Sequence, residues 1–182
     1  MKEAAEREVF LVLRAQTGDR EALDALLASV QEPLYRYVLS LSGERHVAED
    51  VLQETFVRVY RKLGWLREPE LFRPWAYRIA TREAFRHLKR ERRRAERLGD
   101  EEALKALPAP PPREEFAGEL SARLRESVEG LSPASRAAVV LYYLHEMSLD
   151  ETAAVLGVPK GTVKSRLAYG LEALRRQLRG EG

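Results

Sequence analysis

Hydrophobic residues recur along most of the chain at intervals of three and four positions, the spacing that gathers them on one face of an α-helix. No segment shows the sustained alternation of apolar and polar residues that is expected of a β-strand. The pattern and its start and stop signals predict helices over 6–16, 20–29, 32–41, 46–63, 74–94, 116–128 and 132–144, followed by two more, from Ser148 to Gly157 and from Pro159 onward. The chain is therefore expected to have an all-α fold.

The helical pattern weakens between residues 96 and 118, where acidic residues gather and the five positions 108–112 contain four prolines. Proline lacks a backbone N–H and its ring clashes with the preceding turn, so this run cannot continue a helix. Proline-rich segments are extended and semi-rigid, which is typical of a linker. We therefore predict two small helical domains, 1–96 and 115–182, joined by a proline-rich linker over 97–114.

The last third of the chain has the pattern of a helix-turn-helix. Ser148 and Glu151 have the spacing of a capping box, in which each side chain satisfies a backbone N–H of the first turn. Gly157 is expected to end that helix, and Pro159 fits the first position of the next one. The short connection between them predicts that the C-terminal domain is a helix-turn-helix.

The second helix of this pair has an outer face that suits DNA. Its apolar stripe, which includes Val163 and Leu167, is expected to face the core. Ser and Thr side chains can hydrogen-bond base edges, Arg can bridge a guanine, and Lys can hold phosphates. The candidate DNA-binding residues on the outer face are Lys160, Thr162, Lys164, Ser165, Arg166 and Tyr169. An ordinary amphipathic hairpin with a solvated basic face is the alternative.

A second candidate DNA surface comes from the uneven distribution of charge. The 182-residue chain has a net charge of only +2, yet segment 73–97 carries ten Lys or Arg against three Glu, a net of +7. Helical projection aligns Arg78, Arg82, Arg86, Lys89 and Arg93 on one side, without matching acidic residues there, and Trp75 lies at the start. A polyanion would relieve the resulting repulsion. The alternatives are solvated charge or contact with an acidic protein.

The helix over 46–63 predicts a protein-binding face. Burying its apolar residues leaves a group of polar side chains around one valine on the outside, and this group consists of Asp50, Gln53, Glu54 and Val57. An aliphatic residue surrounded by polar residues suits a protein contact.

Composition excludes several other classes of function. The chain has no Cys, and its three His, at 46, 87 and 145, match no metal-ligand spacing, so no metal or cofactor is expected. The carboxylates follow no acid/base or metal-binding pattern and no glycine loop could hold a phosphate, which argues against an enzyme. No apolar run is long enough to cross a bilayer and no secretion signal is present. We therefore expect a cytoplasmic protein.

Five segments, in this order, resemble the bacterial RNA polymerase sigma factors of the sigma-70 family, specifically the extracytoplasmic-function (ECF) group. The segments are 16–23, similar to the family's opening motif; 48–59, to its polymerase-binding helix; 72–80, to its promoter-melting segment; and 131–133 and 161–167, to its fourth conserved region. The resemblance covers nearly the whole chain. It implies that 1–96 is a region 2 domain and 115–182 a region 4 domain.

The resemblance also implies partners and roles. A sigma factor binds core RNA polymerase, directs it to promoter DNA and helps to open the duplex. The face of Asp50, Gln53, Glu54 and Val57 would bind the clamp coiled coil of the largest polymerase subunit, and the second domain would lie on the flap of the next-largest subunit. Family membership further implies control by an anti-sigma factor, with no chemistry performed by the chain itself.

The two basic surfaces would then read the two promoter elements. The second helix of the helix-turn-helix, the recognition helix, would contact the minus-thirty-five element. The minus-ten element would face Trp75, Arg78, Arg82, Arg86 and Lys89. The loop over 64–73 would hold an unstacked base. Where the family usually has Arg-Asn and, further on, Asp, this chain has Thr81, Arg82 and Arg86, so the minus-ten preference does not carry over.

The alternative function is a stand-alone helix-turn-helix regulator of transcription. In that case the second domain would bind promoters, and the first would sense a signal or dimerise. The face around Asp50 distinguishes the two, because only a sigma factor needs it to bind polymerase.

Overall fold

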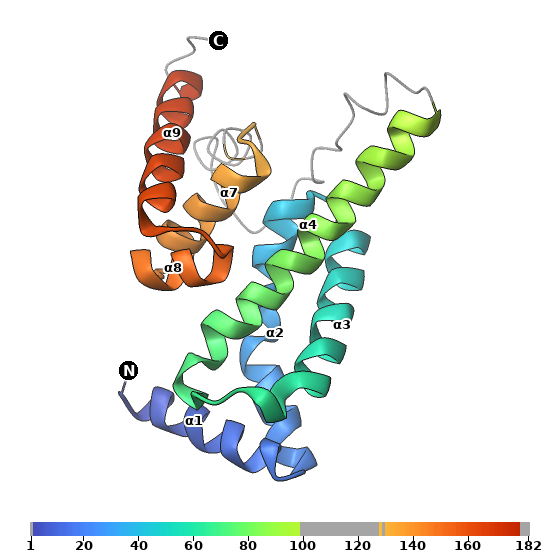
Figure 1. Ribbon diagram of the computed structural model, residues 1–182, viewed down its shortest axis with the longest axis vertical. Helices are drawn as coiled ribbons and strands as arrows, with labels where there is room; N and C mark the ends of the chain where they lie inside the picture. The colour runs from blue at the N-terminus through green and yellow to red at the C-terminus, as the bar shows by residue number, and fades with distance from the viewer. Residues whose placement is uncertain (1, 99–127, 129, 179–182) are drawn as a thin grey trace.

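The computed structural model describes residues 2–98, 128 and 130–178, and these form helices joined by short turns (Figure 1). The N-terminal unit contains α1 (Lys2–Gln16), α2 (Arg20–Ser42), α3 (Arg45–Lys62), two short 3-10 helices, η1 (Leu63–Trp65) and η2 (Pro69–Leu71), and α4 (Phe72–Leu98). The C-terminal unit contains α7 (Pro133–Val139), a π-helical turn, η3 (Val140–Leu144), α8 (Leu149–Leu156) and α9 (Lys160–Leu178). The all-α prediction is confirmed.

The prediction of separate helices over 20–29 and 32–41 is wrong, because α2 runs without a break from Arg20 to Ser42 and contains Pro33. Leu26, Val30 and Leu34 are all fully buried and lie four positions apart. This apolar stripe continues straight through the proline, so burial outweighs the backbone hydrogen bond that the proline removes.

The N-terminal unit has a core in which α2, α3 and α4 pack side by side, with α1 crossing one end of them (Figure 1). Its largest fully buried side chains include Tyr37 and Phe72. Both α2 and α3 therefore pack against α4 and fix its position.

The C-terminal unit is a helix-turn-helix with α7 behind it. Both hydrogen bonds of the predicted capping box are present between Ser148 and Glu151, and Gly157 ends α8 in the left-handed conformation with a φ of 65°. The next helix begins at Lys160, with the carbonyl of Pro159 accepting the first backbone bonds. The helix predicted over 132–144 is α-helical only to Val139 and then widens into the π-helical turn.

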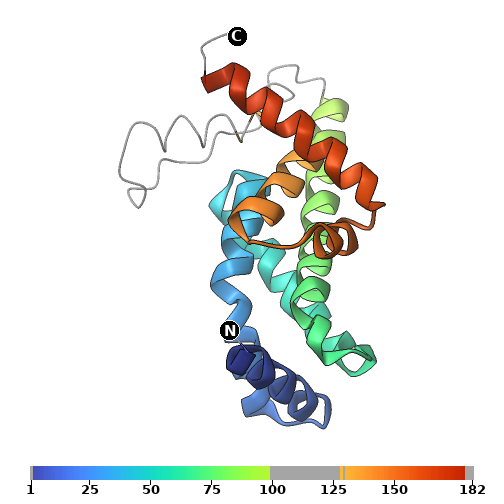
Figure 2. The ribbon, with the colours of Figure 1, turned by 90° about the vertical axis from the view of Figure 1, so that its left-hand side faces the viewer.

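The two units pack directly against each other, and α8 is beside α4, seen nearly end-on against it in Figure 2. Apolar residues of the C-terminal unit, among them Leu141 and Val155, belong to the same buried cluster as the core of the N-terminal unit. Arg136 also donates to the carbonyl groups of Ser40 and Leu41 at 3.4 Å, where the last carbonyls of α2 lack helical partners. α4 continues through Arg97 and Leu98, so the predicted linker over 97–114 begins two residues too early. The rest of that linker and most of the helix predicted over 116–128 lie outside the described residues.

Candidate DNA-binding and polymerase-binding surfaces

The outer face of α9 carries the predicted DNA-binding residues. Val163 and Leu167 are buried beneath it, whereas the side chains of Lys160, Lys164, Ser165 and Tyr169 are exposed and those of Thr162 and Arg166 are half-buried. Lys160 pairs with Asp150 of α8, with its Nζ 2.7 Å from Oδ1, and both side chains are largely exposed. An exposed ion pair of this kind is weak, so a phosphate can replace Asp150 at little cost.

The inner side of α9 approaches α7 closely at Gly170. A Cβ atom built at Gly170 would lie 2.8 Å from Cγ2 of Val139. This separation is too short for two carbon atoms, so α9 or the Val139 side chain would have to move. The absence of a side chain at Gly170 therefore allows α9 to pack at this short distance from α7.

The basic side of α4 is exposed as predicted, with Arg78, Arg82, Arg86 and Lys89 all facing solvent. Trp75 is half-buried and its ring lies 6.3 Å from that of Phe72. The expectation that this side lacks a matching acidic residue is wrong. Glu83 is buried on the same helix and forms an ion pair with Arg86, one turn along, because the carboxylate reaches out from the buried edge of the helix.

The polar face of α3 is exposed as predicted, with Asp50, Gln53 and Glu54 in solvent and Val57 39% exposed. Sequence reasoning missed its neighbour Tyr60, which is 67% exposed. Tyr60 lies three positions after Val57, a spacing that places both on one side of the helix and could have identified it. The apolar part of this face is therefore larger than one valine.

The segment predicted as a loop over 64–73 is irregular only at residues 66–68, since it also contains part of η1, all of η2 and the first two residues of α4. Gln16 fastens it to α1 by donating from Nε2 to the carbonyls of Leu63 at 2.9 Å and Leu66 at 2.8 Å. Trp65, at the end of η1, is 79% exposed, and sequence reasoning did not single it out. The ring of Trp65 is therefore exposed on a turn that is held in place by hydrogen bonds from Gln16.

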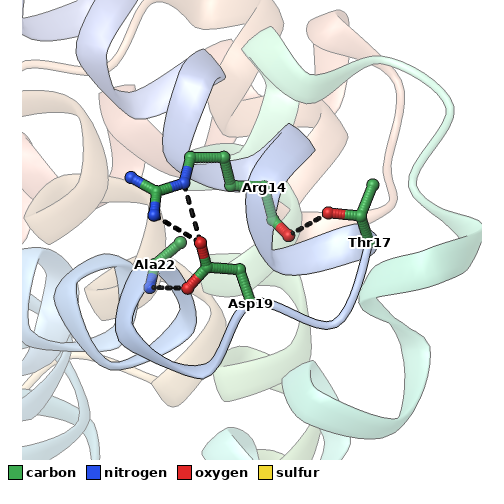
Figure 3. A network of polar contacts seen from close by, with 4 residues as sticks. All are labelled: Arg14, Thr17, Asp19 and Ala22. Carbon is green, nitrogen blue, oxygen red and sulfur yellow. Dashed lines mark hydrogen bonds and ion pairs between the residues drawn. The ribbon is translucent and has the colours of Figure 1, made fainter.

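The motif over 16–23 builds the corner between α1 and α2 (Figure 3). Asp19 caps α2 by accepting from the backbone N–H of Ala22 at 3.0 Å, and it also accepts from Nε of Arg14 at 2.8 Å. These interactions, with the Ala22 bond the larger, lower the pKa of the Asp19 carboxyl. The hydroxyl of Thr17 donates to the Arg14 carbonyl at 2.7 Å, and Gly18 supplies the positive φ of the turn. The motif is therefore structural.

A polar chain that sequence reasoning did not predict joins the two units. The hydroxyl of Thr81 donates to the carbonyl of Tyr77 at 2.7 Å and lies 2.8 Å from the hydroxyl of Tyr37. The hydroxyl of Tyr77 lies 2.9 Å from Nδ1 of His145 in the C-terminal unit. Burial, with a smaller contribution from Arg36, lowers the pKa of His145 to about 4, so its ring is neutral at neutral pH.

Within the part of the chain that the structure describes, no group of three His, Asp or Glu side chains is placed to hold a metal ion. None of the helices in the same ranges is both long and apolar enough to cross a membrane.

The comparison with known families decides between the remaining interpretations. Residues 26–94 match Sigma-70 region 2, and residues 128–176 match Sigma-70, region 4. The chain is 32% identical to the RNA polymerase sigma-H factor of Pseudomonas aeruginosa over 183 residues, an alignment that covers 95% of this chain and 94% of its relative. The chain belongs to the sigma-70 family, in its ECF group. It is therefore a transcription initiation factor, and the stand-alone regulator is set aside.

Other ECF sigma factors align over similar lengths. SigW of Bacillus subtilis is 30% identical over 177 residues, with 92% of this chain and 95% of SigW covered. SigE of Mycolicibacterium smegmatis is 38% identical over 165 residues, with 87% of this chain but only 63% of SigE covered.

Solved structures share the fold. CnrH, in complex with the cytosolic domain of CnrY, has a TM-score of 0.71 at 28% identity, covering 97% of this chain and 99% of CnrH. The sigma factor RpoE of Bartonella quintana, in complex with the anti-sigma factor NepR, has a TM-score of 0.72 at 24% identity, covering 86% of this chain and 96% of RpoE.

Proposed function

We propose that this sigma factor binds core RNA polymerase through the exposed face of α3, with Asp50, Gln53, Glu54 and Val57 against the clamp coiled coil of the largest subunit. The exposure of Val57 and its neighbour Tyr60 supports this role, since apolar and aromatic side chains ringed by polar ones are typical of protein interfaces. The C-terminal unit would lie on the flap of the next-largest subunit. As part of this proposal, the region 2 domain spans 1–96 and the region 4 domain 115–182.

The recognition helix α9 is proposed to read the minus-thirty-five element in the major groove. Its outer face carries small side chains, which let a helix approach the bases, and basic ones at its edges. In this arrangement Thr162, Ser165 and Arg166 contact base edges. Lys160, Lys164 and Tyr169 contact the backbone.

The basic side of α4 is proposed to hold the minus-ten element, through Trp75, Arg78, Arg82, Arg86 and Lys89. The exposed ring of Trp65 supports a role for the neighbouring 64–73 segment in stacking with an unpaired base. Capturing such a base offsets the few kcal/mol that unstacking costs. Binding energy can then open the duplex without ATP.

Control by an anti-sigma factor is also part of the proposal. CnrH, which has the same fold over nearly the whole chain, was solved with the cytosolic domain of another protein bound. An anti-sigma factor that covers the α3 face would prevent polymerase binding. A cytoplasmic location is part of the same proposal, because core polymerase and promoter DNA are there.

One observation carries the proposal, namely that a single sigma-family chain exposes a polar-apolar face on α3 and basic faces on α4 and α9. We would test it by transcription in vitro with bacterial core polymerase on sheared genomic DNA, mapping RNA 5′ ends by sequencing. New start sites that share two upstream sequence blocks are expected only when the protein is present. No new starts would contradict the proposed function.

The polymerase-binding face can be tested in the same reaction. Replacing Asp50, Gln53 and Glu54 by Ala together should abolish both the new starts and co-elution with core polymerase. Asp24→Ala, an exposed acidic residue of α2, is the matched control and should change neither. Unchanged co-elution of the triple variant would contradict the assignment of this face.

A further inference from the structure

Glu83 lies at the buried edge of the basic side of α4, and its side chain is only 7% exposed. Its Oε1 lies 2.7 Å from Nε of Arg58, a residue of α3, and its Oε2 pairs with Nη1 of Arg86. Arg58 follows Val57 directly in the sequence, and Arg86 belongs to the proposed minus-ten surface. One buried carboxylate therefore joins the helix proposed to bind polymerase to the helix proposed to bind DNA.

Burying a carboxylate costs free energy unless it is paired, and both oxygens of Glu83 lie against a guanidinium group, with Arg86 donating a hydrogen bond to it. The three groups together keep a charge of +1, so the cluster still attracts a phosphate. A guanidinium group has five N–H donors, and contact through Nη1 leaves donors of the half-exposed Arg86 for a ligand. Arg86 is thus basic, accessible and held in one orientation.

We propose that Glu83 is a positioning residue, which orients Arg86 for contact with the minus-ten element and connects that contact to α3 through Arg58. This proposal rests on the proposed function of α4. A side chain that is already held in its bound orientation loses less conformational entropy when the ligand arrives, and this strengthens binding. Glu83 itself does not touch DNA.

Glu83→Gln separates positioning from charge, because the two effects have opposite signs. The change keeps the size of the side chain and removes a negative charge from a DNA-facing helix. If Glu83 contributed charge alone, DNA would bind more tightly. If Glu83 positions Arg86, the holoenzyme should bind a fluorescent single-stranded minus-ten oligonucleotide about fivefold more weakly, measured by anisotropy.

Two further variants show through which residue Glu83 acts. In an Arg86→Ala background, Glu83→Gln should not weaken oligonucleotide binding further, because the side chain that Glu83 positions is absent and only the loss of a negative charge remains. Glu91→Gln, the same substitution at an exposed position of α4, is the matched control and should not weaken binding. An additive effect of Glu83→Gln in the Arg86→Ala background would overturn the proposal.

A third variant distinguishes loss of positioning from loss of folding. Arg58→Met combined with Glu83→Gln removes one positive and one negative charge together, so Arg58 is not left as a charge without its carboxylate partner, which is the costly case. Arg86 remains unpositioned, so the fivefold loss should persist. Wild-type affinity in this double variant would overturn the proposal. If Arg86→Ala itself binds the oligonucleotide normally, the minus-ten role of α4 fails instead, and the two failures are thereby distinguished.

Discussion

The two helices proposed to face promoter DNA are held in different ways. α4 packs against α2, α3 and α8, and its Arg86 pairs with a buried carboxylate. α9 packs on α7 and α8, and its Lys160 pairs with the exposed Asp150. Side chains held by buried charges are preorganised, whereas those in exposed pairs exchange partners readily. The difference predicts that the contact made by Arg86 is preorganised, whereas the contact made by Lys160 forms by exchange of one exposed partner for another.

The largest effect is expected from a side chain added where α9 contacts α7. Gly170→Val should lower the free energy of unfolding by about 3 kcal/mol, because the new side chain overlaps Val139. Urea unfolding of the full chain measures this change. Gly161→Ala, on the open side of the same helix, should instead raise stability by about 0.5 to 1 kcal/mol.

The same variant also shows whether the two surfaces are independent. Holoenzyme with Gly170→Val should lose affinity for minus-thirty-five duplex while it retains affinity for the minus-ten single strand, because α4 belongs to the other unit. Equal losses at both elements would show that the units act as one body in DNA binding.

Contacts on α9 can be divided into those that read bases and those that hold phosphates. Arg166→Ala should weaken binding to the specific duplex by about 2 kcal/mol and affect random duplex little, since the residue is proposed to contact a base. Lys164→Ala should weaken both duplexes alike and flatten the dependence of affinity on salt. Titrations at several salt concentrations measure both changes, and identical behaviour of the two variants would contradict the division.

The smallest expected effect concerns the contact between the units, where His145 lies against Tyr77 and Tyr37 and feels the charge of Arg36. Burial lowers the pKa of His145 to about 4, and separation of the units would return it towards the ordinary value of 6.5. Protons therefore bind the separated form first. Lowering the pH from 7 to 5 should weaken the contact, on the order of 1 kcal/mol after allowance for partial exposure.

This effect can be followed by energy transfer between dyes placed on the two units. His145→Gln removes the titrating group, so energy transfer in that variant should not change over the same pH range. A pH response that persists in His145→Gln would assign the effect to another group.

Much of the fold and of the site could be predicted because it depends on local patterns. The capping box at Ser148 and the stop at Gly157 need only neighbouring residues, and both were predicted. The exposed sides of α3, α4 and α9 follow from helical periodicity, since apolar stripes must face a core. Pro33 shows the limit of such reasoning, because burial of the α2 stripe overrides a local breaker.

By itself, the sequence determined the helical class, the positions of most helices, their exposed faces and the family. Only the tertiary structure decided which helices touch. It paired Glu83 with Arg58 across α3 and α4, placed Tyr77 against His145 across the two units, and brought Gly170 against Val139. The physical reason is that helical periodicity tells which side of a helix is buried, whereas the partner that covers it depends on contacts between residues far apart in the chain.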